Sequence, residues 1–388
     1  MKQKVIIWGL TGIMLATRVS ASLTGLREHV DIHWTYDSGE GWTCFAKTEG
    51  GGEDVFQSLD NVFLPLDDSP WESGGQRYIQ PPGETYAFTG VEPDGPIWIA
   101  PQIQLLDQAW PGFNNDQAVG TFGSYQETDP RLSVGDRALS LPWITLSLQS
   151  VAYQGPGSGA FSLWQSDAFG TPTRWLSTVD SAEPDTFPFV AGSHVHLNWG
   201  FGSPGIYRIR LSAAAFLGPG KTNPTDPSAS YTVTFAVGPF AQWQAEHFTA
   251  AELDDASISG ADADPDRDGL KNLTEFAFGM HPKDATRSPL APGLGLPVFS
   301  IVQQGGNYRE TLTYPRRRAG EQFSPLSYVS QFSHTPASGW TSANVVETAA
   351  DFTGDEASLN AVWEKVTASR PVGTSLPPGG FARIKLEE

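Results

Sequence analysis

Two short segments, far apart in the sequence, alternate metal-ligand residue types with apolar residues. The alternating polar residues are His29, Asp31 and His33 in the first segment and His194, His196 and Asn198 in the second. Successive side chains of a strand point to opposite faces, so each segment predicts a strand with its polar groups on one face and its apolar groups toward a core. All the histidines that precede residue 240 lie in these two segments.

Imidazole nitrogens combined with one carboxylate form a donor set that suits zinc first and that copper and iron also accept. If the two strands lie side by side or one strand apart, their polar faces predict a transition-metal site. The predicted ligands are His29, Asp31, His194 and His196. His33 is a further candidate that can fall outside the site, since it lies roughly 6 to 7 Å beyond Asp31 along the strand. Asn198 is expected to support the site or the fold, and the alternative to a metal site is a polar sheet face with exposed or hydrogen-bonded histidines.

A second candidate cation site is the acidic segment 264–275, which matches the pattern D-x-[DN]-x-[DN]-G-x5-E of a 12-residue calcium loop. The predicted oxygen ligands are the side chains of Asp264, Asp266, Asp268, Asn272 and Glu275 and the carbonyl group of Leu270. Gly269 stands where such a loop turns sharply. Pro265 and Lys271 are atypical of paired sensor EF-hands, so we expect a single structural Ca²⁺ site. The alternative is a solvated acidic linker.

Composition limits the protein class. The chain has 388 residues, of which 39% are hydrophobic, and this is enough for two or three domains with cores. Its 41 glycines and 30 prolines, together with frequent aromatic residues, favour β structure with many turns. The formal net charge of −19 argues against nucleic acid and anionic membranes as partners, because both attract Lys and Arg. Metal ions are the expected partners.

The first residues predict export. Residues 1–21 combine Lys2 and Lys4 with an apolar run over residues 5–16 and a small-residue cleavage site at residues 19–21. The apolar run is too short to span a bilayer, so no transmembrane segment is expected after signal cleavage. We expect a secreted or extracellular surface location, with the periplasm as the alternative. Cys44 is the single cysteine, so the chain forms no internal disulfide.

The predicted fold is mainly β: an antiparallel β-sandwich at residues 22–238, a short helical junction with the calcium loop at 239–290, and a smaller β module at 291–388. The clearest sandwich strands are expected at residues 29–36, 97–105, 143–153, 160–165, 194–201, 205–213 and 230–237. Segment 107–142 is expected to be partly irregular, and residues 240–253 predict a short amphipathic helix. Later strands are expected at 298–302, 308–314, 326–332 and 381–386.

Several pieces of the sequence carry a family resemblance over residues 23–238. They are, in order, LTGLREHVDIHWTY, IWIAPQ, GPGSGAFSLWQ, AGSHVHLNWGFGSPGIYRIRLSA and YTVTFAVG. Together they resemble the choice-of-anchor M domain of bacterial surface proteins, whose C-terminal part is the actinobacterial surface-anchored repeat. The resemblance implies an extracellular module, and some members occur beside metal-type transporters. His33 stands where a small residue is usual in that family.

The C-terminal part carries a second resemblance. DADPDRDGLKNLTEFAFGMHP, followed by TLTYPRRRAG, LSYVSQFS, GWTSA and GGFARIKL, is similar to the module that follows a thrombospondin type 3-like calcium loop in many exported bacterial proteins. The sequence shows neither an L-P-x-T-G sortase signal nor a terminal apolar helix, so it does not predict covalent or membrane anchoring. Arg316, Arg317 and Arg318 form a basic cluster that we interpret as a solvated strand end.

The sequence favours a binding protein over an enzyme. It contains no G-x-S-x-G elbow, no phosphate-binding G-x-x-x-x-G-K-[ST] loop and no H-E-x-x-H helix. Paired carboxylates for glycoside hydrolysis remain open, because their spacing is set by the tertiary structure. Tryptophans at strand positions are expected mostly in the core, although some could stack on sugars. The alternative function is therefore a carbohydrate-binding or carbohydrate-cleaving surface protein, with glycans or other surface proteins as partners.

Overall fold

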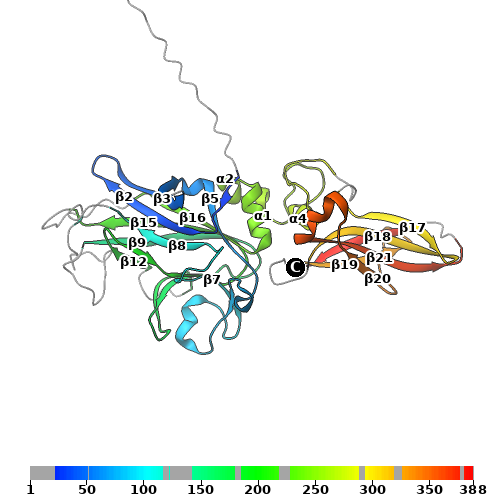
Figure 1. Ribbon diagram of the computed structural model, residues 1–388, viewed down its shortest axis with the longest axis horizontal. Helices are drawn as coiled ribbons and strands as arrows, with labels where there is room; N and C mark the ends of the chain where they lie inside the picture. Colours follow the sequence, from blue (N-terminus) through cyan, green and yellow to red (C-terminus); the bar gives the residue numbers. More distant parts are fainter. Residues whose placement is uncertain are drawn as a thin grey trace, which may run out of the picture.

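The computed structural model describes residues 22–50, 52–116, 122, 142–179, 185–217, 228–287, 293–318, 326–375 and 380–387. Strands account for 49% of the structure and helices for 14%, and the sheets are largely antiparallel, so the predicted fold class is confirmed. Figure 1 shows two β-rich regions with α1, α2 and α4 between them. The predicted export signal and most of the segment predicted to be irregular lie outside the described residues.

The described residues up to Val237 form three sheets. The first has the order β1 (Thr24–Gly25), β5 (Val62–Leu66), β16 (Tyr231–Val237), β15 (Gly205–Ala215), β9 (Trp143–Gln154) and β12 (Thr186–Val190). The second has the order β11 (Pro172–Ser177), β10 (Phe161–Ser166), β14 (Asn198–Phe201), β7 (Pro96–Ala100) and β6 (Arg77–Ile79). The third has the order β13 (His194–His196), β8 (Trp110–Asn114), β2 (His29–Asp37), β3 (Gly41–Gly50) and β4 (Glu53–Gln57). Among the described strands, three pairs are parallel, namely β1–β5, β16–β5 and β2–β8.

Two of the expected strands are shorter than predicted. The strand expected at 97–105 ends at Ala100, and the Gln102 side chain beyond it bonds both backbone groups of Ser166. The strand expected at 194–201 is two strands in different sheets, with Leu197 fully buried between them. The alternation of polar and apolar residues continues through this change of sheet, so the pattern could not reveal the break.

The apolar face of β2 behaves as predicted. Val30, Ile32 and Trp34 are at most 1% exposed and belong to one large core that also contains Trp199 and Phe235. Since these side chains point inward, the intervening polar residues of β2 must lie on the opposite face of the sheet. This alternation positions the candidate site.

The helical junction contains α1 (Pro239–His247), α2 (Ala250–Leu253), α3 (Ala256–Ser259) and α4 (Asn272–Phe278). The single helix expected at 240–253 is wrong, because the chain is extended at Phe248 and restarts at α2. Thr249 forms a capping box with Glu252, and this reciprocal bonding fixes the new helix start. Buried residues of the junction share a second core with Phe63 and Ile206 of the first sheet and with residues of the C-terminal region.

The C-terminal region pairs β17 (Val298–Gln304), β18 (Asn307–Arg317), β21 (Trp363–Gly373) and β20 (Val346–Ala350) in one sheet. A second sheet pairs β19 (Ser327–Ser333) with β22 (Phe381–Glu387). All four strands expected here are present. Residues 298–302 become Val298–Gln304, 308–314 become Asn307–Arg317 and 381–386 become Phe381–Glu387, while 326–332 is shifted by one residue to Ser327–Ser333.

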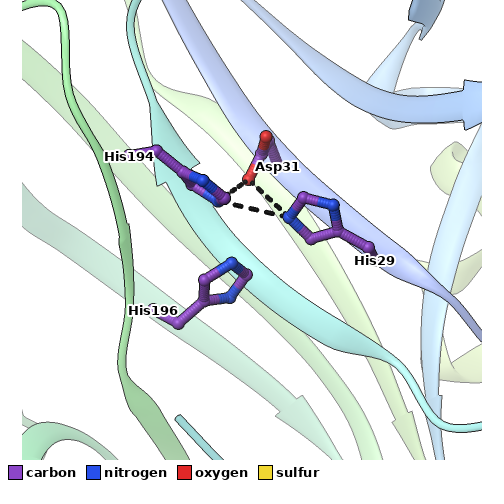
Figure 2. Close-up of side chains that lie close together, drawn as sticks. All are labelled: His29, Asp31, His194 and His196. Carbon is purple, nitrogen blue, oxygen red and sulfur yellow. Dashed lines mark hydrogen bonds and ion pairs between the residues drawn. The ribbon is translucent and has the colours of Figure 1, made fainter. Parts of the chain in front are cut away.

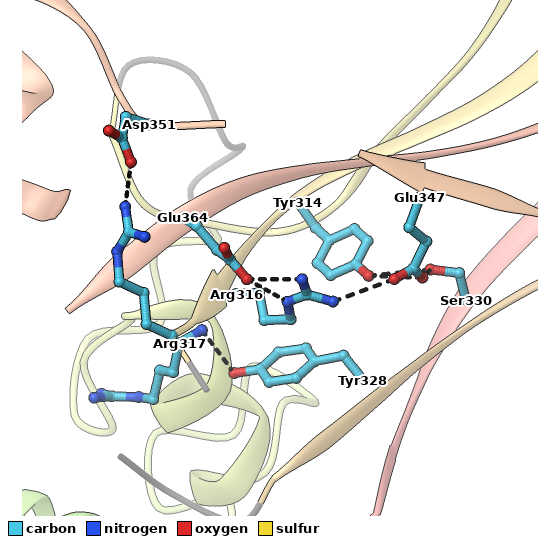
Figure 3. Close-up of polar contacts among 9 residues, drawn as sticks. Tyr314, Arg316, Arg317, Tyr328, Ser330, Glu347, Asp351 and Glu364 are labelled. Carbon is cyan, nitrogen blue, oxygen red and sulfur yellow. Dashed lines mark hydrogen bonds and ion pairs between the residues drawn. The ribbon is translucent and has the colours of Figure 1, made fainter. Parts of the chain in front are cut away.

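The basic cluster at the end of β18 is not a solvated strand end, so that prediction is wrong. Arg316 binds Glu347 and Glu364, as Figure 3 shows. The Arg317 guanidinium lies 3.8 Å from the centre of the Phe276 ring and donates to the Phe276 carbonyl group. Burial lowers the pKa of Arg317 to about 10. The Arg317 contacts attach the C-terminal sheet to α4.

Candidate metal centre

The two predicted ligand segments meet in one sheet. Strands β13 and β2 flank β8, so they lie one strand apart, which is one of the two arrangements that a shared site requires. In the register of this sheet, Gly112 of β8 is the direct neighbour of both Asp31 and His196. Directly opposite residues of a sheet share a face. Figure 2 shows the side chains of His29, Asp31, His194 and His196 turned toward one another.

The donor atoms of these four residues, which we call the His/Asp cluster, all lie within 4.8 Å of one another. Asp31 Oδ1 lies 2.8 Å from His194 Nε2 and 3.3 Å from His29 Nε2. The two Nε2 atoms are 3.2 Å apart. Ligands placed 2.0–2.1 Å from a tetrahedral zinc ion are separated from one another by about 3.3 Å. The cluster could therefore hold a metal ion, with these donor atoms already near ligand spacing.

His196 is oriented by two contacts with β8. Its Nδ1 lies 3.1 Å from the Pro111 carbonyl oxygen, and because a carbonyl can only accept, Nδ1 carries the proton. Its ring stacks on Trp110, with the centroids 3.6 Å apart and 6° between the ring planes. The Nε2 atom is buried and has no hydrogen-bond partner. Holding a histidine by its second nitrogen is how metalloproteins commonly fix the nitrogen that binds the ion.

The electrostatics of the cluster favour an anionic Asp31 beside a neutral His196. Burial, together with the positive charges of His194 and His29, lowers the pKa of His196 to about 4. Burial alone would raise the pKa of Asp31, but the hydrogen bond with His29 and the charges of the histidines lower it overall. The same hydrogen bond with Asp31 raises the pKa of His29. The carboxylate is thus the group that carries negative charge toward a bound cation.

The cluster is partly exposed to solvent. The His194 side chain is 39% exposed and that of His29 is 24% exposed, whereas Asp31 is only 5% exposed. His194 lies on β13, which is the edge strand of its sheet. A metal ion could therefore arrive past His194 and meet Asp31 at the bottom of the site.

Sequence reasoning missed two residues of β8 that shape this site. Gly112 lies between the ligand strands, and a Cβ atom there would come within 2.8 Å of His196 Cε1 and 3.0 Å of Asp31 Oδ1. The absence of a side chain keeps the space between these two groups open. Trp110 supplies the ring under His196 and also lies 4.9 Å from the His29 ring centre. The segment WPGFN carries no alternation of metal-ligand types, so nothing in the sequence pairs it with the histidines.

His33 and Asn198 lie outside the cluster. His33 Nδ1 is 2.8 Å from Asn114 Oδ1, and the ring packs at 5.2 Å from that of Phe56. Asn198 was expected on the same face as the two later histidines, but it begins β14 in another sheet. Its side chain pairs with Gln102 there, accepting from the backbone N–H and donating to the side-chain oxygen. The change of sheet at Leu197 is the physical reason.

The acidic segment forms a second group that could hold a metal ion. One oxygen each from Asp264, Asp266 and Asp268 lies within 4.8 Å of the others. Aspartate oxygens accept hydrogen bonds from the backbone N–H groups of Asp268, Gly269 and Leu270, which curls the loop around them. Gly269 has a φ of +89°, the left-handed conformation that favours glycine at this turn.

Glu275, in the first turn of α4, is not part of this group, but the charges of the three aspartates act on it. It is 1% exposed, and its Oε2 has no hydrogen-bond partner. Burial and then the charges of the three loop aspartates raise its pKa to about 8. Asn272 is fully buried and donates to the carbonyl groups of Ile258 and Gly260, so its amide nitrogen ties the loop to α3. Its Oδ1 is buried and unpartnered.

Comparisons with known proteins do not assign the chain to a family. No protein-family profile matches the chain, and no curated protein matches it. The two family resemblances therefore stay predictions. Within the described part of the chain, no helix combines the length and apolar character needed to cross a bilayer.

The two groups differ in the chemistry they offer. The His/Asp cluster presents three imidazoles and one carboxylate, a set that suits borderline and transition-metal ions. The acidic group presents only oxygen atoms, which suit hard cations. Each group also contains a buried metal-ligand atom without a hydrogen-bond partner, His196 Nε2 in the first and Asp266 Oδ2 in the second.

Proposed function

We propose that this chain is an exported, non-enzymatic protein that binds a transition metal, zinc first, at the His/Asp cluster. One observation carries the proposal: His196 Nε2 is buried without a partner and faces a group in which Asp31 Oδ1 lies 2.8 Å from His194 Nε2. Leaving a buried polar atom unpaired is costly, so its retention beside three other ligand atoms argues for an ion. Copper and iron accept the same donors and are the alternatives.

The number of donors favours binding over catalysis. Zinc in structural sites is usually surrounded by four protein ligands, whereas a catalytic zinc keeps one position for water or substrate. Three histidines and one aspartate fill four positions. The 39% exposure of the His194 side chain leaves the site within reach of solvent, which suits reversible capture of an ion.

We further propose that the loop at 264–275 binds Ca²⁺ and has a structural role. Its ligands would be the side chains of Asp264, Asp266, Asp268 and Glu275, with Leu270 and Asn272 completing the predicted set. The loop leads directly into α4, whose Phe276 contacts Arg317 of the C-terminal region. Calcium would neutralise the repulsion among the carboxylates and so stiffen this junction.

The proposed location follows from the sequence. A secreted or surface-exposed protein meets calcium at concentrations that a weak loop can use, and the export signal at residues 1–21 remains the reason to expect that location. The resemblance to the choice-of-anchor M domain fits the same compartment. It also fits metal binding, since some members of that family occur beside metal-type transporters.

Metal content tests the leading proposal. Purified full-length protein, stripped with chelator and reloaded with an equimolar mixture of zinc, copper and iron salts, should carry one transition-metal ion per chain by native mass spectrometry. His196→Ala should carry none, while His33→Ala, on the same sheet face but outside the cluster, should load normally. Absence of any stoichiometric transition metal in the wild-type protein would rule the proposal out.

A second candidate function is carbohydrate binding, which one observation favours. Trp71 is 41% exposed and stacks on Tyr78, with ring centres 5.1 Å apart and 21° between the planes. Exposed aromatic rings of this kind offer a flat apolar face for a sugar. A glycan array separates the two functions: sugar binding that is lost in Trp71→Ala and unaffected in His196→Ala would favour the carbohydrate function.

A further inference from the structure

A cavity of about 420 Å³ lies where the first sheet meets the helical junction. On one side it is bounded by Gly155, which follows the end of β9, and by Pro204 and Gly205 at the start of β15. On the other side lie Phe240 and Ala241 of α1 and residues that precede the acidic loop. This volume is within the range of about 300 to 1,000 Å³ that is typical of small-molecule sites.

The walls of the cavity are mostly apolar, but one buried polar group in them lacks a partner. Gln154, the last residue of β9, accepts from the Ser259 hydroxyl group through Oε1 at 3.1 Å. Its Nε2 is buried without a hydrogen-bond partner. Gly260 lies beside this amide, where a Cβ would come within 2.4 Å of the Ala256 carbonyl oxygen and 3.2 Å of Gln154 Nε2. A buried N–H donor without an acceptor is costly, and an acceptor on a ligand would remove that cost.

The charges around the cavity decide which ligands are compatible. Asp68 and Asp262 are among its lining residues, and no described Lys or Arg lines it. Asp68 already accepts from Trp98 and Arg77 through the same oxygen, Oδ1. Asp262 is also paired, since its Oδ1 lies 2.6 Å from Lys271 Nζ. The lining therefore offers an anionic ligand no free cation, and a neutral ligand needs none.

We propose that this cavity is a binding site for a small neutral molecule with an apolar body and one carbonyl or hydroxyl oxygen. The apolar body lies between the sheet ends and α1, and the oxygen accepts the hydrogen bond that Gln154 Nε2 can donate. The site is separate from the His/Asp cluster in chain position and in chemistry, so it does not depend on the metal function.

Prodan, a neutral naphthalene ketone whose emission reports polarity, tests the proposal on the full-length protein. It should bind saturably at one equivalent with blue-shifted emission. Ala256→Phe, which adds a ring to the cavity wall, should weaken binding at least tenfold, while Ala251→Phe, an exposed alanine on α2 that does not line the cavity, should leave it unchanged. Circular dichroism confirms that each variant is folded.

The amide is tested separately. Gln154→Leu should weaken prodan binding about fivefold to tenfold, as expected for loss of one hydrogen bond. It should not change the affinity for 2-ethylnaphthalene, which has the ring system but no oxygen. That affinity is measured by the displacement of prodan. Gln149→Leu, on the same strand outside the cavity, is the control. Absence of saturable prodan binding, or equal binding by the wild type and Ala256→Phe, would overturn the proposal; if Ala256→Phe does not fold, an unchanged affinity in Gln154→Leu overturns it.

Discussion

The His/Asp cluster and the acidic loop are both candidate cation sites, but the fold assembles them in different ways. The acidic loop takes its carboxylates from Asp264 to Glu275, one short stretch of chain. The His/Asp cluster takes its ligands from β2 and β13, which are held at ligand spacing only because β8 lies between them. The first site depends on local turn geometry, and the second depends on the register of a whole sheet.

This difference determines which other residues matter at each site. In the loop, the backbone N–H groups of Asp268, Gly269 and Leu270 hold the carboxylates, so the neighbours are part of the motif itself. In the cluster, the supporting groups are Pro111, Trp110 and Gly112 of the intervening strand. A site whose ligands come from segments far apart in the sequence therefore needs supporting residues that the ligand pattern does not reveal.

The largest expected effect is loss of a ligand from the cluster. His194→Ala should lower transition-metal affinity by more than about 100-fold, since even outer supporting residues of a metal site contribute about 10 to 100-fold. The fold should survive, because Leu197 and Trp199 make the nearby core contacts. Isothermal titration with zinc measures the affinity. His33→Ala serves as the control, and an unchanged affinity in His194→Ala would remove that residue from the site.

The scaffold should matter almost as much as the ligands. Gly112→Val places a side chain in the space between Asp31 and His196, so zinc affinity should fall by about 10 to 100-fold. Competition with a zinc-binding dye measures the loss. Gly39→Ala, in the turn between β2 and β3, should bind zinc like the wild type. Normal zinc affinity in Gly112→Val would show that the cluster does not need this opening.

For the acidic loop, the expected effect is on stability. Calcium that binds only the folded chain at 100 times its Kd stabilises it by about 2.7 kcal/mol. Asp266→Ala and Glu275→Gln should remove most of that gain, because the first removes a carboxylate of the group and the second a carboxylate on which the charges of the group act. Thermal unfolding with calcium and with chelator measures it, and Asp262→Asn, whose side chain is 92% exposed, is the control. Equal melting temperatures of the wild type in both conditions would contradict calcium binding.

The smallest expected effect concerns a cation that already contacts the loop. Arg287 Nε lies 3.4 Å from Asp268 Oδ2, and its side chain is 49% exposed. Arg287→Ala should raise calcium affinity by at most about fivefold, because an exposed ion pair contributes about 0.2 to 1 kcal/mol. Calcium titration followed by intrinsic fluorescence measures the change. A weaker affinity in this variant would mean that Arg287 supports the loop instead of competing with calcium.

The sequence predicted the parts of the fold that local patterns encode. The alternation in β2 placed Val30, Ile32 and Trp34 in the core and grouped its polar residues on the other face. The same alternation failed at residues 194–201, because it continues unchanged while the chain passes from one sheet to another at Leu197. A period of two shows that residues are extended, but it does not show which strand they pair with.

Other features depended on tertiary contacts that no local pattern carries. The role of β8 follows from its parallel pairing with β2, which joins segments far apart in the chain. The sequence predicted Arg317 to be a solvated charge, but its side chain lies against Phe276 and Trp363, which come from other elements. The break before α2 could have been found, because Thr249 and Glu252 have the spacing of a capping box.

The most direct test of the central proposal is a crystal structure of the zinc-soaked protein with diffraction data collected on both sides of the zinc absorption edge. We expect one anomalous peak among His29, Asp31, His194 and His196, about 2.0 to 2.1 Å from the nitrogen ligands and about 2.0 to 2.2 Å from an Asp31 oxygen. A fully loaded crystal with zinc elsewhere and no peak between β2 and β13 would contradict the account.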